Sequence, residues 1–283
     1  MMKNVVWIIL GVLVFAGGLI FSFEGKGNFS PGEDYTYRID AKWELPDILE
    51  EVSGIEWLDE NKIACIQDED GIIFIYELSS SKIKKEIKFA GPGDYEGIAI
   101  DDETAYVLRS DGTIFEIQEF QSSKPIVSKH NTFLTDDQNV EGLCLDKENN
   151  RLLLALKDKD LLKKDFKGVY SFVLSENKLL EQPFFELDLN DKLLSESGDK
   201  ISKRLRPAEI EIHPISSEIY ILDAKSPKLL ILSPSGIIKK IYKLNEDDFS
   251  QPEGLTFTPD GTLYISNEAG SNAANILKVK LNN

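Results

Sequence analysis

The chain has 283 residues, and its 49 acidic against 32 basic side chains give a formal net charge of −17. A surface of this charge repels nucleic acid and anionic lipid, so neither is expected as an electrostatic partner. The length that follows an N-terminal apolar run suits one all-β domain rather than two modules.

That apolar run covers residues 4–23, twenty positions without a charge. As a helix it is long enough to cross a hydrocarbon layer of about 30 Å, so we expect a transmembrane anchor. Lys3 precedes the run, which places the N-terminus in the cytoplasm and the rest of the chain on the extracytoplasmic (periplasmic or extracellular) side of the cell membrane. A cleaved signal peptide is the alternative, although Gly25-Lys26-Gly27 is a poor cleavage site. Residues 24–34 are rich in Gly, Ser and Pro and predict a flexible linker to a domain over residues 35–283.

The domain contains a degenerate segment that returns five times. The copies are Val52-Ser53-Gly54-Ile55, Tyr95-Glu96-Gly97-Ile98, Val140-Glu141-Gly142-Leu143, Pro207-Ala208-Glu209-Ile210 and Pro252-Glu253-Gly254-Leu255. Successive copies are 43, 45, 67 and 45 residues apart. A period in the forties with strand-like content is typical of a β-propeller blade, and the long third interval indicates an insertion.

Each copy begins a strand, a turn rich in Asp, Asn or Gly, and a second strand, and two further strands follow in each unit. The last unit has only three strands, ending at residues 276–281, while residues 35–45 supply a strand before the first copy. Pairing these ends closes the ring and removes exposed edges, so we predict an all-β, five-bladed propeller. Six blades remain the alternative if the insertion hides one. We favour five because residues 168–173 and 184–187 already serve as the third and fourth strands of blade three.

Polar side chains recur where the first strand of each hairpin starts and where the second ends, which is the same mouth of the channel. The first set is Ser53, Glu96, Glu141, Glu209 and Glu253, and the second is Asp68, Arg109, Asp158, Asp223 and Glu268. Converging carboxylates repel one another unless a cation compensates them, and calcium suits carboxylate oxygens and extracytoplasmic conditions. We therefore expect a calcium ion held by Glu96, Glu141, Glu209 and Glu253, with Glu268 and Asp223 as outer or alternating ligands.

The alternative for each glutamate is a hydrogen bond from backbone amides of the neighbouring blade. Glu209 is the most doubtful ligand, because Ala208-Glu209 shifts the acid by one position and so to the other face of the strand unless a bulge corrects it. The insertion ends in a basic cluster, Lys200, Lys203, Arg204 and Arg206. Together with Arg109, the arginines Arg204 and Arg206 could bind a carboxylate or phosphate of a small anionic ligand, or they could pair with surrounding acids.

The Glu-Gly-Ile and Glu-Gly-Leu repeats, the stretch over residues 252–268 and the preceding apolar run resemble the SdiA-regulated (YjiK-like) propeller family, and more distantly NHL-repeat proteins. The resemblance covers about residues 40–282 and implies a five-bladed propeller with a calcium site, without an established biochemical role. The two cysteines and two histidines form no zinc-type spacing, so we expect Cys65 and Cys144 to be buried thiols.

Three functions are consistent with these patterns. The first is a membrane-anchored, calcium-binding propeller that binds a ligand or a protein partner at its channel mouth. The second is a calcium-dependent hydrolase, such as a phytase-like phosphoesterase or a lactonase. The third is a scaffold whose ion stiffens the ring. The sequence carries no histidine cluster, Gly-x-Ser-x-Gly or P-loop, so an enzyme is the less favoured reading.

Overall fold

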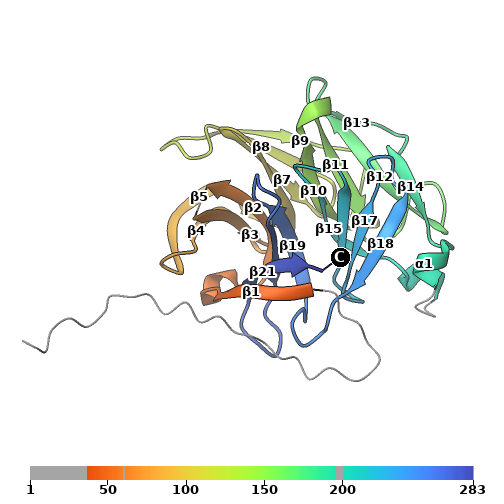
Figure 1. Cartoon of the computed structure of the whole chain (residues 1–283). Helices are drawn as coiled ribbons and strands as arrows, with labels where there is room; N and C mark the ends of the chain where they lie inside the picture. Colours follow the sequence, from red (N-terminus) through yellow and green to blue (C-terminus); the bar gives the residue numbers. More distant parts are fainter. Residues whose placement is uncertain (1–36, 60, 196–199, 283) are drawn as a thin grey trace, which may run out of the picture.

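The five repeat segments form the innermost strands of five blades in the computed structural model, which describes residues 37–59, 61–195 and 200–282 (Figure 1). These strands are β2 (Val52–Asp59), β6 (Tyr95–Asp101), β10 (Val140–Asp146), β15 (Pro207–Ile212) and β19 (Pro252–Phe257). Each contacts the next, and β19 contacts β2, so the five strands surround a central channel. The prediction of a five-bladed all-β propeller is confirmed.

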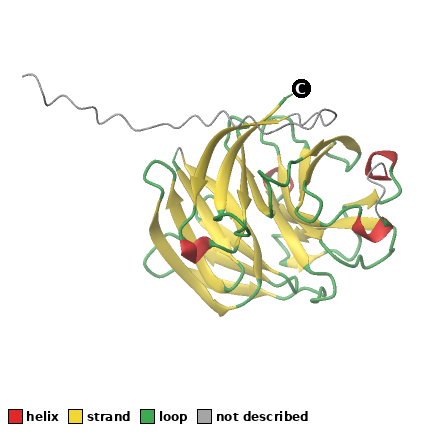
Figure 2. Cartoon of the chain, turned by 90° about the horizontal axis from the view of Figure 1, so that it is seen from below, coloured by secondary structure: helices red, strands yellow, loops and turns green. Residues whose placement is uncertain are grey.

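The remaining strands extend each blade outward by antiparallel pairing, and the sheets fan around the ring (Figure 2). Blade 1 adds β3 (Lys62–Gln67), β4 (Asp70–Glu77) and β5 (Lys82–Pro92), and blade 2 adds β7 (Thr104–Arg109), β8 (Ile114–Gln118) and β9 (Ile126–His130). Blade 3 adds β11 (Arg151–Leu156) and β12 (Phe166–Val173), and both β13 (Lys178–Leu179) and β14 (Phe185–Asp188) pair with β12. Blade 4 adds β16 (Ile219–Asp223), β17 (Lys228–Leu232) and β18 (Ile238–Lys243), and blade 5 adds β20 (Leu263–Asn267) and β21 (Asn275–Leu281).

The ring closes through the strand that precedes the first repeat. Strand β1 (Tyr37–Glu44) pairs antiparallel with β21, from Tyr37 opposite Leu281 to Glu44 opposite Asn275. The outermost strand of blade 5 therefore comes from the N-terminal side of the domain, as the strand count predicted. Because Asn275 lies opposite Asn267 at the mouth end of β20, Tyr37 lies at the end of the blade away from the mouth.

The insertion enlarges the connection between blades 3 and 4 without adding a blade. Its described part contributes β14, a short helix α1 (Lys192–Ser195) and the 3-10 turn η3 (Ile201–Lys203). Two other 3-10 turns are η1 (Asp47–Leu49) and η2 (Lys147–Asn149). No helix among the described residues is long and apolar enough to cross a membrane, and the expected anchor at residues 4–23 and linker at residues 24–34 lie outside the described residues.

The hydrophobic core is divided among the interfaces between neighbouring blades. Ile73 of blade 1 shares one cluster with Val107 and Phe115 of blade 2, and Leu153 of blade 3 shares another with Ile210 of blade 4. This division follows from the alternation of side chains along each strand, which gives every blade two apolar faces. Cys65 and Cys144 are fully buried free thiols in two different clusters, as expected.

A bulge interrupts each inner strand at the repeat segment. The register shifts between Val52 and Gly54, and again at the corresponding place in the other four inner strands. The glycine that follows the bulge lies against the next inner strand. A Cβ on Gly97 would stand 2.6 Å from the Cβ of Leu143 and 3.0 Å from the carbonyl oxygen of Glu141. The repeated glycine is therefore required by close approach of neighbouring blades.

Candidate cation site at the channel mouth

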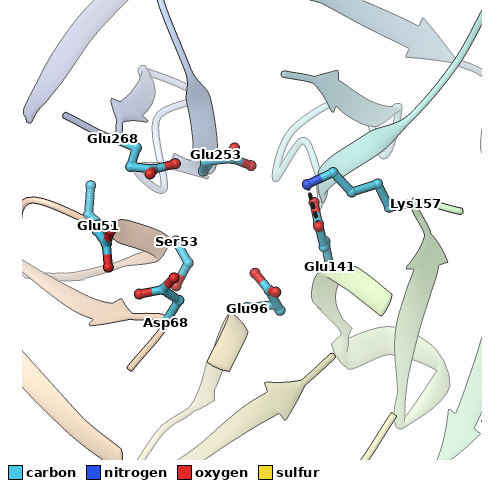
Figure 3. A pocket seen from close by; sticks show the side chains of 9 residues that line it. Glu51, Ser53, Asp68, Glu96, Glu141, Lys157, Glu253 and Glu268 are labelled. Carbon is cyan, nitrogen blue, oxygen red and sulfur yellow. Dashed lines mark ion pairs between the residues drawn. The ribbon is translucent and has the colours of Figure 1, made fainter. Parts of the chain in front are cut away.

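A cavity of about 120 Å³ opens at the mouth of the channel, where the inner strands begin (Figure 3). Six carboxyl groups and one ammonium group line it, along with Val52 and Ser53. The charged side chains are Glu51, Asp68, Glu96, Glu141, Lys157, Glu253 and Glu268. The lining is thus strongly acidic in a space that holds only a few water molecules.

Two structural positions of the blades supply most of this lining. The first is the bulge residue of the inner strand, which is Ser53, Glu96, Glu141 and Glu253 in four of the blades. The second is the residue after the second strand, where blade 1 has Asp68, blade 3 has Lys157 and blade 5 has Glu268. The bulge turns a residue that strict alternation would bury between blades toward the channel axis.

Blade 4 breaks the acidic ring. Its bulge residue is Ala208, and the residue after its second strand is Ala224; both are buried and neither lines the cavity. The carboxyl groups therefore come from blades 1, 2, 3 and 5, and the side toward blade 4 has no acid at either position.

Burial and mutual repulsion raise the pKa of the lining acids. Burial first, and then the negative charge of Glu141, raise the pKa of Glu96 to about 9. Burial also raises the pKa of Glu253 to about 7, and burial together with the nearby Glu51 raises that of Asp68 to about 7. The cavity thus favours protonated carboxyl groups near neutral pH, because among the described residues Lys157 alone adds a positive charge to its lining.

Glu141 is the most constrained of these acids. Its side chain is 4% exposed, and its Oε1 accepts a hydrogen bond from Asn139 Nδ2 at 3.0 Å and pairs with Lys157 Nζ. Its Oε2 is buried and has no hydrogen-bond partner. The Oδ1 atom of Asp68 is likewise buried without a hydrogen-bond partner. Burial raises the pKa of Glu141 to about 8 in spite of the Lys157 charge. A buried carboxylate oxygen without a partner is costly, and a cation at the mouth would remove that cost for both atoms.

The structure places two of the six expected metal ligands away from the cavity. Glu209 occupies the position that is glycine in the other blades, and its Oε1 accepts hydrogen bonds from the amides of Leu143 at 2.8 Å and Ile210 at 2.9 Å. The bulge between Pro207 and Glu209 does not return it to the channel. Glu209 therefore joins blade 4 to blade 3, which was the alternative role for these glutamates.

Asp223 is also engaged by the protein. Its side chain is fully buried. The Oδ2 atom pairs with Lys228 Nζ at 2.7 Å and accepts a hydrogen bond from the amide of Arg206 at 2.9 Å. Its Oδ1 accepts from the amides of Lys225 and Ser226, so the carboxylate holds the turn between β16 and β17. Of the predicted ligands, Glu96, Glu141, Glu253 and Glu268 are brought together around the cavity.

The three arginines expected to bind an anion do not line the cavity. Arg109 pairs with Asp111, with its Nη2 2.5 Å from Oδ2, and Arg206 pairs with Asp158 through Nη2 at 2.6 Å. Arg204 donates to the carbonyl oxygen of Leu189 at 2.9 Å. Their placement agrees with the alternative, in which cations pair with nearby polar groups of the protein, and gives no support to a phosphate clamp.

Three lining residues were missed as members of the site. Asp68 stood in the second set of polar residues but was not chosen as a ligand, and Lys157 takes the place assigned to Asp158 because β11 ends at Leu156. Glu51 directly precedes the first repeat copy, as Asp94 precedes the second, and the residue before each copy was not predicted as part of the site. The register at the end of the second strand was the signal that could have identified Asp68 and Lys157.

A second acidic pair lies on the inner strands and does not line the mouth cavity. Burial raises the pKa of Glu211 on β15 to about 8, and burial followed by the charge of Glu211 raises that of Glu56 on β2. Thr256 lies 3.4 Å from Glu56 Oε2. Each of these residues lies three positions after the bulge residue of its strand, and sequence reasoning did not single them out.

The donor chemistry of the mouth fits a calcium ion, because the unpartnered atoms are carboxylate oxygens. Within residues 37–59, 61–195 and 200–282, no group of three or more His, Cys, Asp or Glu side chains is arranged to hold a metal as the side chains stand. Calcium accepts water among its six to eight ligands, and the lining glutamates have rotatable side chains.

Comparisons with known proteins agree with the fold. A family model described as SdiA-regulated matches residues 30–271. A search of curated protein sequences finds no match.

Among solved structures, the glutaminyl cyclase of Myxococcus xanthus superposes with a TM-score of 0.62 at 14% identity, covering 87% of this chain and 96% of that chain. The PQQ-bound aldose sugar dehydrogenase of Streptomyces coelicolor gives 0.53 at 10% identity, covering 86% and 97%. A streptogramin B lyase gives 0.51 at 13% identity, covering 88% and 100%. At these identities the similarity shows the fold alone.

Proposed function

The chain belongs to the SdiA-regulated family of β-propellers, and from this premise we propose that it is a calcium-binding protein that recognises a ligand or protein partner at its channel mouth. One observation carries the proposal. Within the described part of the chain, six carboxyl groups meet a single ammonium group in the mouth cavity, and Glu141 Oε2 is buried there without a partner. A compact divalent cation would offset the excess charge and give that oxygen a ligand.

The gap in the ring at blade 4 supports ligand recognition beside the ion. Ala208 and Ala224 offer no side-chain oxygen, so an ion held by the other four blades would keep coordination sites open toward blade 4. A small anionic ligand, or a carboxylate of a partner protein, has the charge to fill them. Water would fill them in the absence of such a ligand.

The proposed location is the extracytoplasmic side of the cell membrane, with residues 4–23 as the anchor. Strand β1 begins at Tyr37, at the end of blade 5 opposite the mouth. The predicted flexible linker over residues 24–34 would separate the domain from the bilayer without fixing the direction in which the mouth faces.

The test is a calcium titration of the purified protein by calorimetry, with thermal melting in calcium and in chelator. We expect saturable binding and a higher melting temperature, both lost in the double variant Glu96→Gln/Glu253→Gln. The matched control is Glu86→Gln/Glu176→Gln, which removes two exposed carboxylates far from the cavity lining. Calcium binding that is equal in both double variants, or absent from the unmodified protein, would refute the proposed site.

A further inference from the structure

Among the residues that the structure describes, Lys157 is the one cationic side chain in the lining of the mouth cavity. It follows β11 directly, at the position where blade 1 has Asp68 and blade 5 has Glu268. Its backbone is fixed, because its amide donates to the carbonyl oxygen of Asn139 at 2.9 Å. Blade 3 thus places a positively charged side chain where blades 1 and 5 have a carboxylate.

The ammonium group reaches into the cavity toward two acids. Figure 3 shows Lys157 extending from blade 3 to Glu141, with Glu253 on the other side of its Nζ. Its side chain is 12% exposed, so little water solvates the charge. The carboxylates replace that lost hydration and hold the ammonium in place.

Lys157 uses one oxygen of Glu141 and leaves the other without a partner. A metal ion bound to Glu141 Oε2 would lie close to the ammonium, and two positive charges so near each other repel. Either the ammonium moves away when the metal enters or the metal binds more weakly. In both cases the cation already present in the site opposes the one that arrives.

We propose that Lys157 is a built-in counter-ion that competes with a bound metal for Glu141 and so makes the mouth select divalent over monovalent cations. This inference rests on the proposed cation site. A sodium or potassium ion brings the same single charge that the ammonium already supplies, so it gains little by displacing Lys157. Calcium brings twice the charge at similar size, and the energy of attraction to each carboxylate doubles.

The competition can be measured by replacing Lys157 with methionine, which keeps the length of the side chain and removes the charge. Calcium affinity is determined by calorimetry in N-methylglucamine chloride and in sodium chloride at equal ionic strength. We expect Lys157→Met to bind calcium about tenfold more tightly in the bulky-cation buffer. Sodium should then weaken binding to the variant by several-fold, while the unmodified protein binds equally in both salts.

The matched control is Lys159→Met, which removes an equal charge from an exposed lysine paired with Asp137. Its calcium affinity should stay within twofold of the unmodified protein. A second variant, Lys157→Arg, keeps the charge and should keep the insensitivity to sodium. It also preserves the test if Lys157→Met folds poorly in chelator, because an arginine variant that competes with sodium would contradict the proposal.

The outcomes distinguish failure of the counter-ion role of Lys157 from failure of the cation site itself. Calcium binding by Lys157→Met that is unchanged or weaker, and insensitive to sodium, would overturn the counter-ion role and leave the cation site in place. Absence of calcium binding from the unmodified protein and from every variant would overturn the site and this inference with it.

Discussion

Replacing Glu209 with alanine should destabilise the propeller far more than the removal of an exposed acid would. The side chain is 1% exposed, and its Oε1 accepts from the amides of Leu143 and Ile210. Alanine leaves both N–H groups buried without an acceptor. An unsatisfied buried donor costs about 1–3 kcal/mol, so the loss of an acceptor for both amides should lower the free energy of unfolding by roughly 2–6 kcal/mol. In a domain of this size that corresponds to a fall in melting temperature of about 4–24 °C.

The assay is thermal melting at pH 7, followed by circular dichroism, together with calcium titration. Glu209→Gln keeps an acceptor oxygen at the same place, and burial already raises the pKa of Glu209, so glutamine should melt close to the unmodified protein. Glu211→Ala is the matched control two residues along the same strand, because Glu211 Oε1 accepts only from the amide of its neighbour Ile212 within blade 4. It should lose less stability than Glu209→Ala.

A Glu209→Ala variant that melts within about 1 °C of the unmodified protein would refute this role, since even one amide without an acceptor should lower the melting temperature by more than that. A large loss of calcium affinity in Glu209→Gln, with the melting temperature preserved, would also contradict it. That result would return Glu209 to the metal ligands.

Three further predictions follow from the same geometry. The lining acids are protonated more readily in the folded than in the unfolded chain, with the pKa of Glu96 raised to about 9, so without calcium the free energy of unfolding should fall as pH rises from about 4.5 to 9. Calcium affinity should rise over that range, with proton release seen as a buffer-dependent enthalpy. Gly97→Ala should cost about 1–3 kcal/mol because its Cβ would stand 2.6 Å from that of Leu143, whereas Gly91→Ala, with nothing within 4 Å, should be nearly neutral in denaturant unfolding. Asp223→Asn should cost about 3–5 kcal/mol by leaving the buried Lys228 charge unpaired, and Asp223→Asn/Lys228→Met should recover much of the lost melting temperature.

The fold could be predicted from the sequence because four of the five repeat copies have a glycine at the same position, for the same local reason. Gly97 and Gly142 stand where a Cβ would meet the backbone of the next inner strand, so the same residue type returns at the same place in the repeat. The closure by β1 was also predictable, since one strand was missing at one end of the sequence and one was spare at the other. Both conclusions rest on the spacing of residues along the chain.

Only part of the site could be predicted from the sequence. Glu96, Glu141, Glu253 and Glu268 were predicted at the mouth and lie there. Glu209 was grouped with them because it is also an acid in the repeat, yet a shift of one residue along a strand turns a side chain to the other face. The sequence raised this doubt and could not settle it, because only the position of the bulge decides which residue faces the channel.

The amino-acid sequence by itself determined the number of blades, the closing strand and the acidic character of the mouth, since these depend on periodicity and on side-chain type. Only the tertiary structure decided which charges share the cavity. Lys157 lines the cavity and Asp158 does not, because β11 ends at Leu156 and the next residue points inward. Asp223 lies away from the cavity and pairs with Lys228 on the next strand. Charge pairing depends on distances of a few ångströms between segments far apart in the chain, and spacing along the sequence does not encode such distances.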